Sequence, residues 1–263
     1  MRDMTAYGAL SALFYDADKP AAPAEEIAWY AARLPRGAGP VLEPMCGSGR
    51  LLVPLVDAGF NVHGVDASAA MLARCEARIG TRSAPVPLFR QDIVALNLPF
   101  RYAAAFFAAG SVQLVADPAL ARAALERVRA HLVAPGLLLL DLFVPPEHAQ
   151  RIAAPLVEVR TASLPDGTRI ALRSETTMHP DARMAHTTSR YVHRRGHDLI
   201  AEESESLALT WYAPEDIAAL VESAGFTDVE TATSSRASLS GDGKAFALTA
   251  RVSGLSNVGP RVL

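Results

Sequence analysis

Val41-Leu42-Glu43-Pro44-Met45-Cys46-Gly47-Ser48-Gly49 runs from a short apolar strand into a loop that contains two glycines. Gly47 and Gly49 allow the backbone to turn tightly and to approach a ligand at the N-terminus of the next helix, predicted over residues 49–58. A glycine pair of this kind also occurs for packing alone. It therefore indicates a ligand site only where the surrounding sequence supports the same interpretation.

Segments of strand length alternate with segments of helix length across the first half of the chain. Strands are predicted at residues 40–42, 62–65, 87–89, 103–108 and 137–143. Further helices are predicted at residues 69–79 and 118–132, the second with Asp117 as its N-cap and Pro118 in its first position. This alternation is typical of β-α-β units, in which helices cover both faces of a parallel sheet and ligands bind beyond the carboxyl ends of the strands.

Three acidic residues stand at the ends of three successive predicted strands. Glu43 closes the first strand, Asp66 closes the second, and Asp92 follows the third. The carboxylate of Asp66 is placed to accept hydrogen bonds from two ribose hydroxyls. Asp92 is placed to accept from an adenine amino group, while Ile93 and Met71 cover the faces of the ring. A helix cap or a solvated loop explains any one of these acids, but all three in order indicate a ligand that contains adenosine.

The glycine loop distinguishes between two cofactors of this kind. A dinucleotide site requires a third glycine three residues after the second, and this chain has Leu52 there. Glu43 ahead of the loop would repel a pyrophosphate. S-adenosylmethionine carries an ammonium that favours a nearby acid and a carboxylate that suits the loop amides. The residues therefore favour S-adenosylmethionine over NAD.

These features resemble the class I methyltransferases, specifically the bacterial small-molecule type that carries a β-sheet insertion after the fifth strand. The resemblance covers nearly the whole chain. It rests on the segments 41–50, 64–68 with Met71, 91–93, 110–114, 132–136, and 211–215 with 224–226. Met45 stands where the family usually has its first loop glycine, and Ala103 stands where the fourth strand usually begins with an acid. Met45 would narrow the end of the site that holds the methionyl group.

The resemblance implies an α/β fold with a Rossmann-like seven-stranded sheet, helices on both faces, and an antiparallel final strand at residues 244–252. It also implies S-adenosyl-L-methionine as the cofactor. Tyr15 resembles the N-terminal segment that folds over the cofactor in this family. The implied cofactor-binding residues are Tyr15, Glu43, Gly47, Asp66, Ala67, Met71, Asp92, Ile93 and Ala109.

The sequence changes character after Pro145-Pro146. Residues 156–160 and 169–173 alternate apolar and polar side chains, and Asp166-Gly167 between them predicts a hairpin turn. Three or four antiparallel strands are therefore expected as an inserted β-sheet cap.

We predict a methyltransferase core over residues 1–155 and 211–252 and an inserted cap over residues 156–210. The cap is expected to form the pocket for the methyl acceptor. The alternation of its strands fits sheet packing or a homodimer interface equally well. The candidate substrate-binding residues are Gln113, His148, Arg173, Tyr191 and Trp211.

The chemistry expected of such a site is methyl transfer to nitrogen or oxygen of a small metabolite. The protein mainly has to align the acceptor lone pair and exclude water. A hydroxyl acceptor usually needs a general base, whereas an amine needs only to arrive unprotonated. No base is evident, so no catalytic residue is assigned and an amine is slightly preferred. The histidines of the insertion lack the spacing of metal ligands, so no metal is predicted. The alternatives are a nucleotide- or tRNA-modifying methyltransferase, and a cofactor-binding module that regulates a partner without catalysis.

Charge and composition narrow the partners. The chain has 25 basic and 28 acidic residues, a formal net charge of -3 and no dense basic run, unlike a nucleic-acid-binding surface. The longest apolar run, residues 136–144, contains Asp141 and is too short to span a bilayer. Two cysteines make no disulfide framework, and the N-terminus does not resemble a signal peptide. We expect a cytoplasmic protein with a small-molecule partner and neither a nucleic-acid nor a membrane partner.

Overall fold

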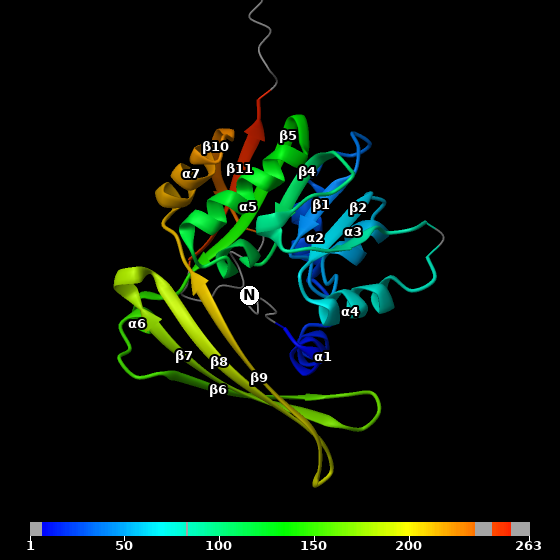
Figure 1. Cartoon of the computed structure of the whole chain (residues 1–263), viewed down its shortest axis with the longest axis vertical. Helices are drawn as coiled ribbons and strands as arrows, with labels where there is room; N and C mark the ends of the chain where they lie inside the picture. The colour runs from blue at the N-terminus through cyan, green and yellow to red at the C-terminus, as the bar shows by residue number, and fades with distance from the viewer. Residues whose placement is uncertain (1–6, 83, 235–243, 254–263) are drawn as a thin grey trace, which may run out of the picture.

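The computed structural model describes residues 7–82, 84–234 and 244–253, which are organised around two sheets (Figure 1). A seven-stranded sheet forms the centre of the molecule, and a separate four-stranded sheet faces the carboxyl ends of its parallel strands. In such an arrangement the space between the two sheets is where a ligand is expected.

The central sheet has the strand order β3-β2-β1-β4-β5-β11-β10. Strands β3, β2, β1, β4 and β5 are parallel to one another, and β11 runs antiparallel to both of its neighbours. The strand order reverses between β1 and β4, which is the position where open α/β sheets bind their ligands. The bounds are β1 (Val41–Pro44), β2 (Val62–Asp66), β3 (Leu88–Arg90), β4 (Tyr102–Phe107), β5 (Leu132–Val144), β10 (Thr227–Thr233) and β11 (Lys244–Val252).

Helices cover both faces of this sheet because each has one apolar side. On one face, α2 (Ala24–Ala31), α3 (Leu52–Asp57) and α4 (Ala69–Ile79) contribute to a buried cluster with β1, β2 and β4. On the other face, α5 (Pro118–His131) and α7 (Pro214–Ser223) pack into a second cluster. The shorter segments are η1 (Ile93–Ala95), η2 (Ser111–Leu114), α6 (Glu147–Gln150) and η3 (Pro180–Ala182). None of the helices in the described ranges is long and apolar enough to cross a membrane.

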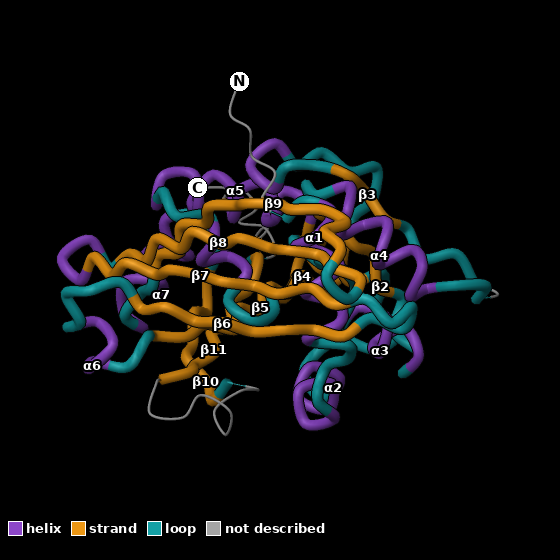
Figure 2. The backbone as a smooth tube through the Cα atoms, turned by 90° about the horizontal axis from the view of Figure 1, so that it is seen from below, coloured by secondary structure: helices purple, strands orange, loops and turns teal. Residues whose placement is uncertain are grey.

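The second sheet is antiparallel, with the order β6-β7-β8-β9. Its strands are β6 (Leu156–Ser163), β7 (Arg169–His179), β8 (Met184–Arg195) and β9 (Asp198–Thr210). Seen from below, the four strands lie across the end of the central sheet (Figure 2). Helix α1 (Ala9–Asp18) lies between this sheet and α4 (Figure 1).

The predicted α/β fold is confirmed, including the antiparallel final strand and the inserted antiparallel sheet. The carboxylate of Asp117 caps α5 as expected, since it accepts hydrogen bonds from the amides of Ala119 (2.8 Å) and Leu120 (3.2 Å). The division into a core of residues 1–155 and 211–252 and a cap of residues 156–210 stays a prediction. Helix α1, assigned to that core, packs on the second sheet as well as on α4.

A buried histidine in β2 makes the stability of the fold depend on pH. His63 is 4% exposed, and its Nδ1 lies 3.3 Å from the hydroxyl of Tyr102. Burial lowers the pKa of His63 below its usual value of 6.5. When the pH falls below 6.5, the unfolded chain binds a proton at His63 more readily than the folded chain does. The free energy of unfolding therefore falls as the pH decreases through this range.

We expect a His63→Gln variant to lose this part of the acid sensitivity, because glutamine does not titrate. The exposed His197 supplies the matched control, and His197→Gln should retain it. Urea unfolding of the three proteins on either side of the usual histidine pKa measures the effect. An unchanged pH dependence in His63→Gln would show that another group is responsible.

Candidate functional site

A cavity of about 1120 Å³ lies between the carboxyl ends of the central strands and strand β9. Loops that follow β1, β2, β3 and β4 line one side, and residues 203–209 of β9 line the other. The N-terminal segment contributes Tyr7, Gly8 and Tyr15. Pockets for single small ligands are typically about 300–1,000 Å³, so this space lies at the upper end of that range or just above it.

The loop after β1 is held in a tight left-handed path. Met45, Gly47 and Gly49 have φ angles of 57°, 56° and 75°. A β-carbon on Gly49 would lie 2.5 Å from the Sγ of Cys75, so only glycine allows α4 to pack closely against this loop. The amides of Cys46, Gly47 and Gly49 are bonded to the carbonyl of Val65, the carboxylate of Asp66 and the carbonyl of Cys46, which fixes the loop beside the cavity.

Glu43 is the most unusual charged group of the site. It is 3% exposed, lines the cavity, and its Oε2 atom is buried without a hydrogen-bond partner. Burial raises the pKa of Glu43 well above its usual value, and the nearby Arg50 guanidinium opposes this shift only in part. A buried carboxylate of this kind is costly unless a cation or a donor pairs with it. The cavity therefore provides a position for a positively charged group next to Glu43.

Asp66 connects the end of β2 to the glycine loop. Its Oδ2 accepts a hydrogen bond from the amide of Gly47 (2.8 Å), and its Oδ1 accepts one from the amide of Ser68 (2.8 Å). Burial raises the pKa of Asp66, while the backbone hydrogen bonds lower it. Asp66 is only half-buried and lines the cavity, so it both holds the loop and presents a carboxylate to a ligand.

The third acid, Asp92, lies where β3 ends. Its carboxylate accepts from the amide of Val94 (3.0 Å) and so caps η1. Ile93 and Met71 are buried beside it and line the same cavity. This group supplies one polar and two apolar surfaces to a ligand.

The structure places all nine predicted cofactor residues along this one cavity. They come from α1, from the last residues of β1 and β2, and from the segments that follow β1, β2, β3 and β4. They are Tyr15, Glu43, Gly47, Asp66, Ala67, Met71, Asp92, Ile93 and Ala109. Residues far apart in the sequence are brought together because parallel strands end at the same edge of the sheet.

The structure places the five predicted substrate residues elsewhere. Gln113 is fully buried, where its amide donates to the carbonyls of Phe143 (3.0 Å) and Thr210 (3.1 Å). Its side chain therefore joins the ends of β5 and β9. Trp211 is 3% exposed, directly after β9.

The other three lie on the second sheet or beside it. Tyr191 packs against Phe14, and its hydroxyl donates to Oε1 of Glu205 (2.7 Å). Arg173 is exposed and pairs with Glu175, and His148 is exposed on α6. In the described structure none of the five residues lines the cavity, so their role in acceptor binding stays a prediction.

Two acids of β9 line the cavity and were not among the predicted residues. Glu203 accepts hydrogen bonds from the amides of Leu10 and Ser11, both at 3.0 Å, and Glu205 accepts from the amide of Tyr7 (3.1 Å). They attach the N-terminal segment to the second sheet. Strand alternation is the signal that places them on one face. It does not say which face is inside, because Glu202 on the opposite face is equally acidic.

Met45 occupies a backbone conformation that favours glycine, since its φ is 57°. Met45→Gly and Met45→Ala remove the same side chain, but only glycine relieves the left-handed strain. We expect the Gly variant to be about 1 kcal/mol more stable than the Ala variant. Chemical denaturation of the two variants measures the difference, and an Ala variant at least as stable as the Gly variant would contradict it.

Comparison with known proteins identifies the type of domain. Residues 41–136 match the family model described as a methyltransferase domain. A curated protein from Geobacillus sp. (strain WCH70), whose name assigns it provisionally to the methyltransferases, is 30% identical over 107 residues. That match covers 41% of this chain and 43% of the relative, so it spans less than half of the relative's length.

Solved structures share the fold over nearly the whole chain. An S-adenosylmethionine-dependent methyltransferase from Clostridium acetobutylicum superposes with a TM-score of 0.73 at 15% identity, covering 91% of this chain and 96% of that one. A sugar N-methyltransferase from Streptoalloteichus sp. superposes with a TM-score of 0.72 at 20% identity, covering 97% of this chain and 98% of that one. An amino pentose methyltransferase from Micromonospora echinaspora superposes with a TM-score of 0.64 at 23% identity, covering 95% of this chain and 99% of that one. The resemblance to class I methyltransferases is thus confirmed at the level of the fold and of the domain at residues 41–136.

Proposed function

Because residues 41–136 match a methyltransferase domain within a class I fold, we propose that this chain is an S-adenosylmethionine-dependent methyltransferase. Its acceptor is an amino nitrogen on a small, sugar-like molecule. The observation that carries the proposal is the buried, unpartnered Oε2 of Glu43 at the end of β1 in the cavity.

The cofactor fits the residues around this carboxylate. The methionyl ammonium of S-adenosylmethionine is the cation that Glu43 lacks, and the loop amides beside Gly47 suit the methionyl carboxylate. Asp66 and Asp92 stand at the next two strand ends, as hydrogen-bond acceptors for ribose and adenine. A pyrophosphate in place of the methionyl group would meet the charge of Glu43 instead.

The charge of the cavity supports an amine acceptor. Two cationic side chains line the cavity, Lys19 and Arg50. Six carboxylates line it as well: Glu43, Asp66, Asp92, Asp117, Glu203 and Glu205. Arg50 is already paired with Glu26 at 2.7 Å. An acidic cavity attracts a cationic ligand such as an ammonium. Among the described lining residues there is no histidine, so an acceptor hydroxyl would find no imidazole base.

The fold relatives support the same class of acceptor. One is a sugar N-methyltransferase, another acts on an amino pentose, and a glycopeptide N-methyltransferase is 26% identical with a TM-score of 0.55. In this chain residues 203–209 of the second sheet line the cavity, and we place the acceptor beside them.

The residues of this chain bind, orient and shield the reactants. S-adenosylmethionine, when bound, supplies an electrophilic methyl group. Glu43 and the glycine loop fix one end of the site, and Tyr7 and Tyr15 close it from the N-terminal side. The acceptor amine has to arrive as the free base, and a lining carboxylate is available to take up its proton. Alignment and exclusion of water then account for the acceleration.

Matched acceptors test the proposal. The full-length protein is incubated with S-adenosylmethionine and either glucosamine or glucose, each free and as a nucleoside diphosphate sugar, and methylated product is detected by mass spectrometry. Methylation of amino sugars but not of the hydroxyl counterparts is expected. Methylation of the hydroxyl compounds alone would contradict the amine acceptor, and cofactor binding without any transfer to these sugars would contradict the acceptor class.

A further inference from the structure

Helix α1 contacts both the second sheet and helix α4, which covers the central sheet. Its apolar side belongs to the second sheet, because Leu10 and Phe14 are buried in a cluster with Ile170, Leu172 and Tyr191. Its polar side faces α4. The helix also carries Tyr15, which lines the cavity, so its position determines how far the site is covered.

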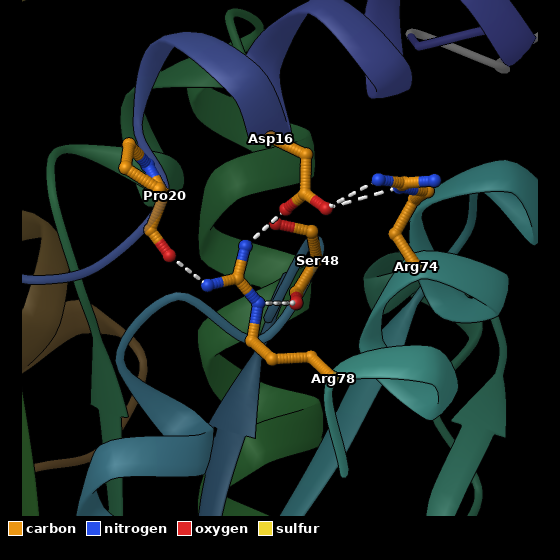
Figure 3. A network of polar contacts seen from close by, with 5 residues as sticks. All are labelled: Asp16, Pro20, Ser48, Arg74 and Arg78. Carbon is orange, nitrogen blue, oxygen red and sulfur yellow. Dashed lines mark hydrogen bonds and ion pairs between the residues drawn. The ribbon is translucent and has the colours of Figure 1, made fainter. Parts of the chain in front are cut away.

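The contact between α1 and α4 is a network of charged groups (Figure 3). Asp16 forms ion pairs with Arg74, at 2.9 Å, and with Arg78. The guanidinium of Arg78 donates to three groups, namely the carboxylate of Asp16, the carbonyl of Pro20 and the carbonyl of Ser48. Its bond to Ser48 measures 3.1 Å from Nε to the oxygen.

Both ends of this network adjoin residues of the proposed cofactor site. Asp16 follows Tyr15 on α1, and Ser48 stands between Gly47 and Gly49 in the glycine loop. The side chains of Asp16 and Arg78 are 13% and 19% exposed, so solvent only partly screens their interaction. A planar guanidinium has several donors in fixed directions, and it can therefore hold two backbone segments and a carboxylate in one arrangement.

We propose that Arg78 is a positioning residue that couples closure of α1 over the cavity to the conformation of the glycine loop. The inference rests on the proposed function, since it concerns how that cofactor site opens. When α1 moves away from α4, the bonds of Arg78 to Asp16 and Pro20 break. The guanidinium, which also binds the carbonyl of Ser48, then loses the partners that fix its direction. Withdrawal of the covering tyrosine and loosening of the glycine loop therefore occur together.

The nature of the two contacts indicates where the opening occurs. The apolar cluster keeps α1 on the second sheet, because separating it would expose buried side chains to water. The ion pairs with α4 cost less to replace, since water and salt ions solvate the separated charges. Cofactor release is therefore expected to accelerate as the ionic strength increases.

The test compares Arg78→Met with Arg82→Met in the full-length protein. Arg82 lies four residues further along and pairs instead with Asp57 of α3 at 2.9 Å, so it controls for the loss of an arginine at this end of α4. The dissociation rate of S-adenosylhomocysteine is measured by stopped flow. Hydrogen exchange of the amides of residues 9–18 is measured without ligand.

We expect Arg78→Met to accelerate dissociation by about tenfold, the effect of losing roughly one charged hydrogen bond. The same variant should exchange the α1 amides faster and show a weaker salt dependence of release, since only the pair of Asp16 with Arg74 remains. Arg82→Met should resemble the wild type in all three measurements. Arg78→Lys keeps the positive charge but not the several N–H donors of the planar guanidinium. Its dissociation rate should lie between those of Arg78→Met and the wild type.

Two results would overturn the inference. One is release by Arg78→Met at the wild-type rate, and the other is equal acceleration in Arg82→Met. Thermal melting verifies that Arg78→Met folds, and Asp16→Asn, which breaks the same contact from α1, is measured beside it and is expected to accelerate release as well. Absence of S-adenosylhomocysteine binding in the wild type would contradict the proposed function itself, so the two failures are distinct.

Discussion

Replacement of Glu43 by glutamine is expected to weaken S-adenosylhomocysteine binding by about a hundredfold, because a charge-assisted hydrogen bond to the ligand ammonium is lost. The same change should stabilise the protein without ligand at neutral pH. Glu43 is buried and its Oε2 has no partner, so the ionised carboxylate destabilises the fold more than the neutral amide does.

The raised pKa of Glu43 makes both the stability of the protein and its affinity for the cofactor depend on pH, in opposite directions. Since the pKa of Glu43 is raised by burial, the folded protein retains a proton at a pH where the unfolded chain has lost it. The contribution of Glu43 to stability is thus present at low pH and is lost as the pH rises above the usual value of 4.5. Cofactor binding requires the ionised carboxylate and should strengthen as the pH rises through the raised pKa.

Calorimetric titration and denaturant unfolding of Glu43→Gln measure the two effects. Glu76→Gln removes an exposed acid from α4 and serves as the control for the change of charge. A Glu43→Gln variant that binds the ligand as the wild type does, or that keeps the wild-type pH dependence, would show that Glu43 does not pair with the ligand.

Replacement of Asp66 by alanine is expected to weaken S-adenosylhomocysteine binding as much as the Glu43 variant does, but for a different reason. The variant loses the carboxylate that faces the ligand, and it releases the amide of Gly47 from its hydrogen bond. Together these losses should weaken S-adenosylhomocysteine binding by about a hundredfold or more.

The matched control is Asp57→Ala, which removes an exposed aspartate of α3 that lies outside the cavity lining. Calorimetry on both variants measures the affinities, and circular dichroism verifies the fold. If Asp66→Ala kept the wild-type affinity, the role of Asp66 would be confined to the geometry of its own loop.

The sequence was informative where physical rules tie a residue to one position. Glu43, Asp66 and Asp92 could be located because apolar strands have recognisable ends and parallel strands end at one edge of the sheet. The same rule brought their neighbours to one cavity. Helix α4 was predicted at its observed bounds from its apolar spacing, and the structure adds that the side chain of Ser68 caps it by accepting from the amide of Met71.

The acceptor side was harder to predict, since it depends on contacts between distant segments. A period of two separates the faces of a strand but does not tell which face is covered. Tyr191 and Glu205 both lie on the covered face, yet only Glu205 lines the cavity, because α1 packs over Tyr191. Strand β10 was missed because its residues are mostly exposed and polar at the edge of the sheet.

The central claim is that the loop from Glu43 to Gly49 binds S-adenosylmethionine and not a dinucleotide. Isothermal titration of the full-length protein with S-adenosylhomocysteine and, separately, with NAD tests it most directly. We predict saturable binding of S-adenosylhomocysteine and none of NAD, with the first lost in Glu43→Gln. Tight binding of NAD together with no binding of S-adenosylhomocysteine would contradict the claim.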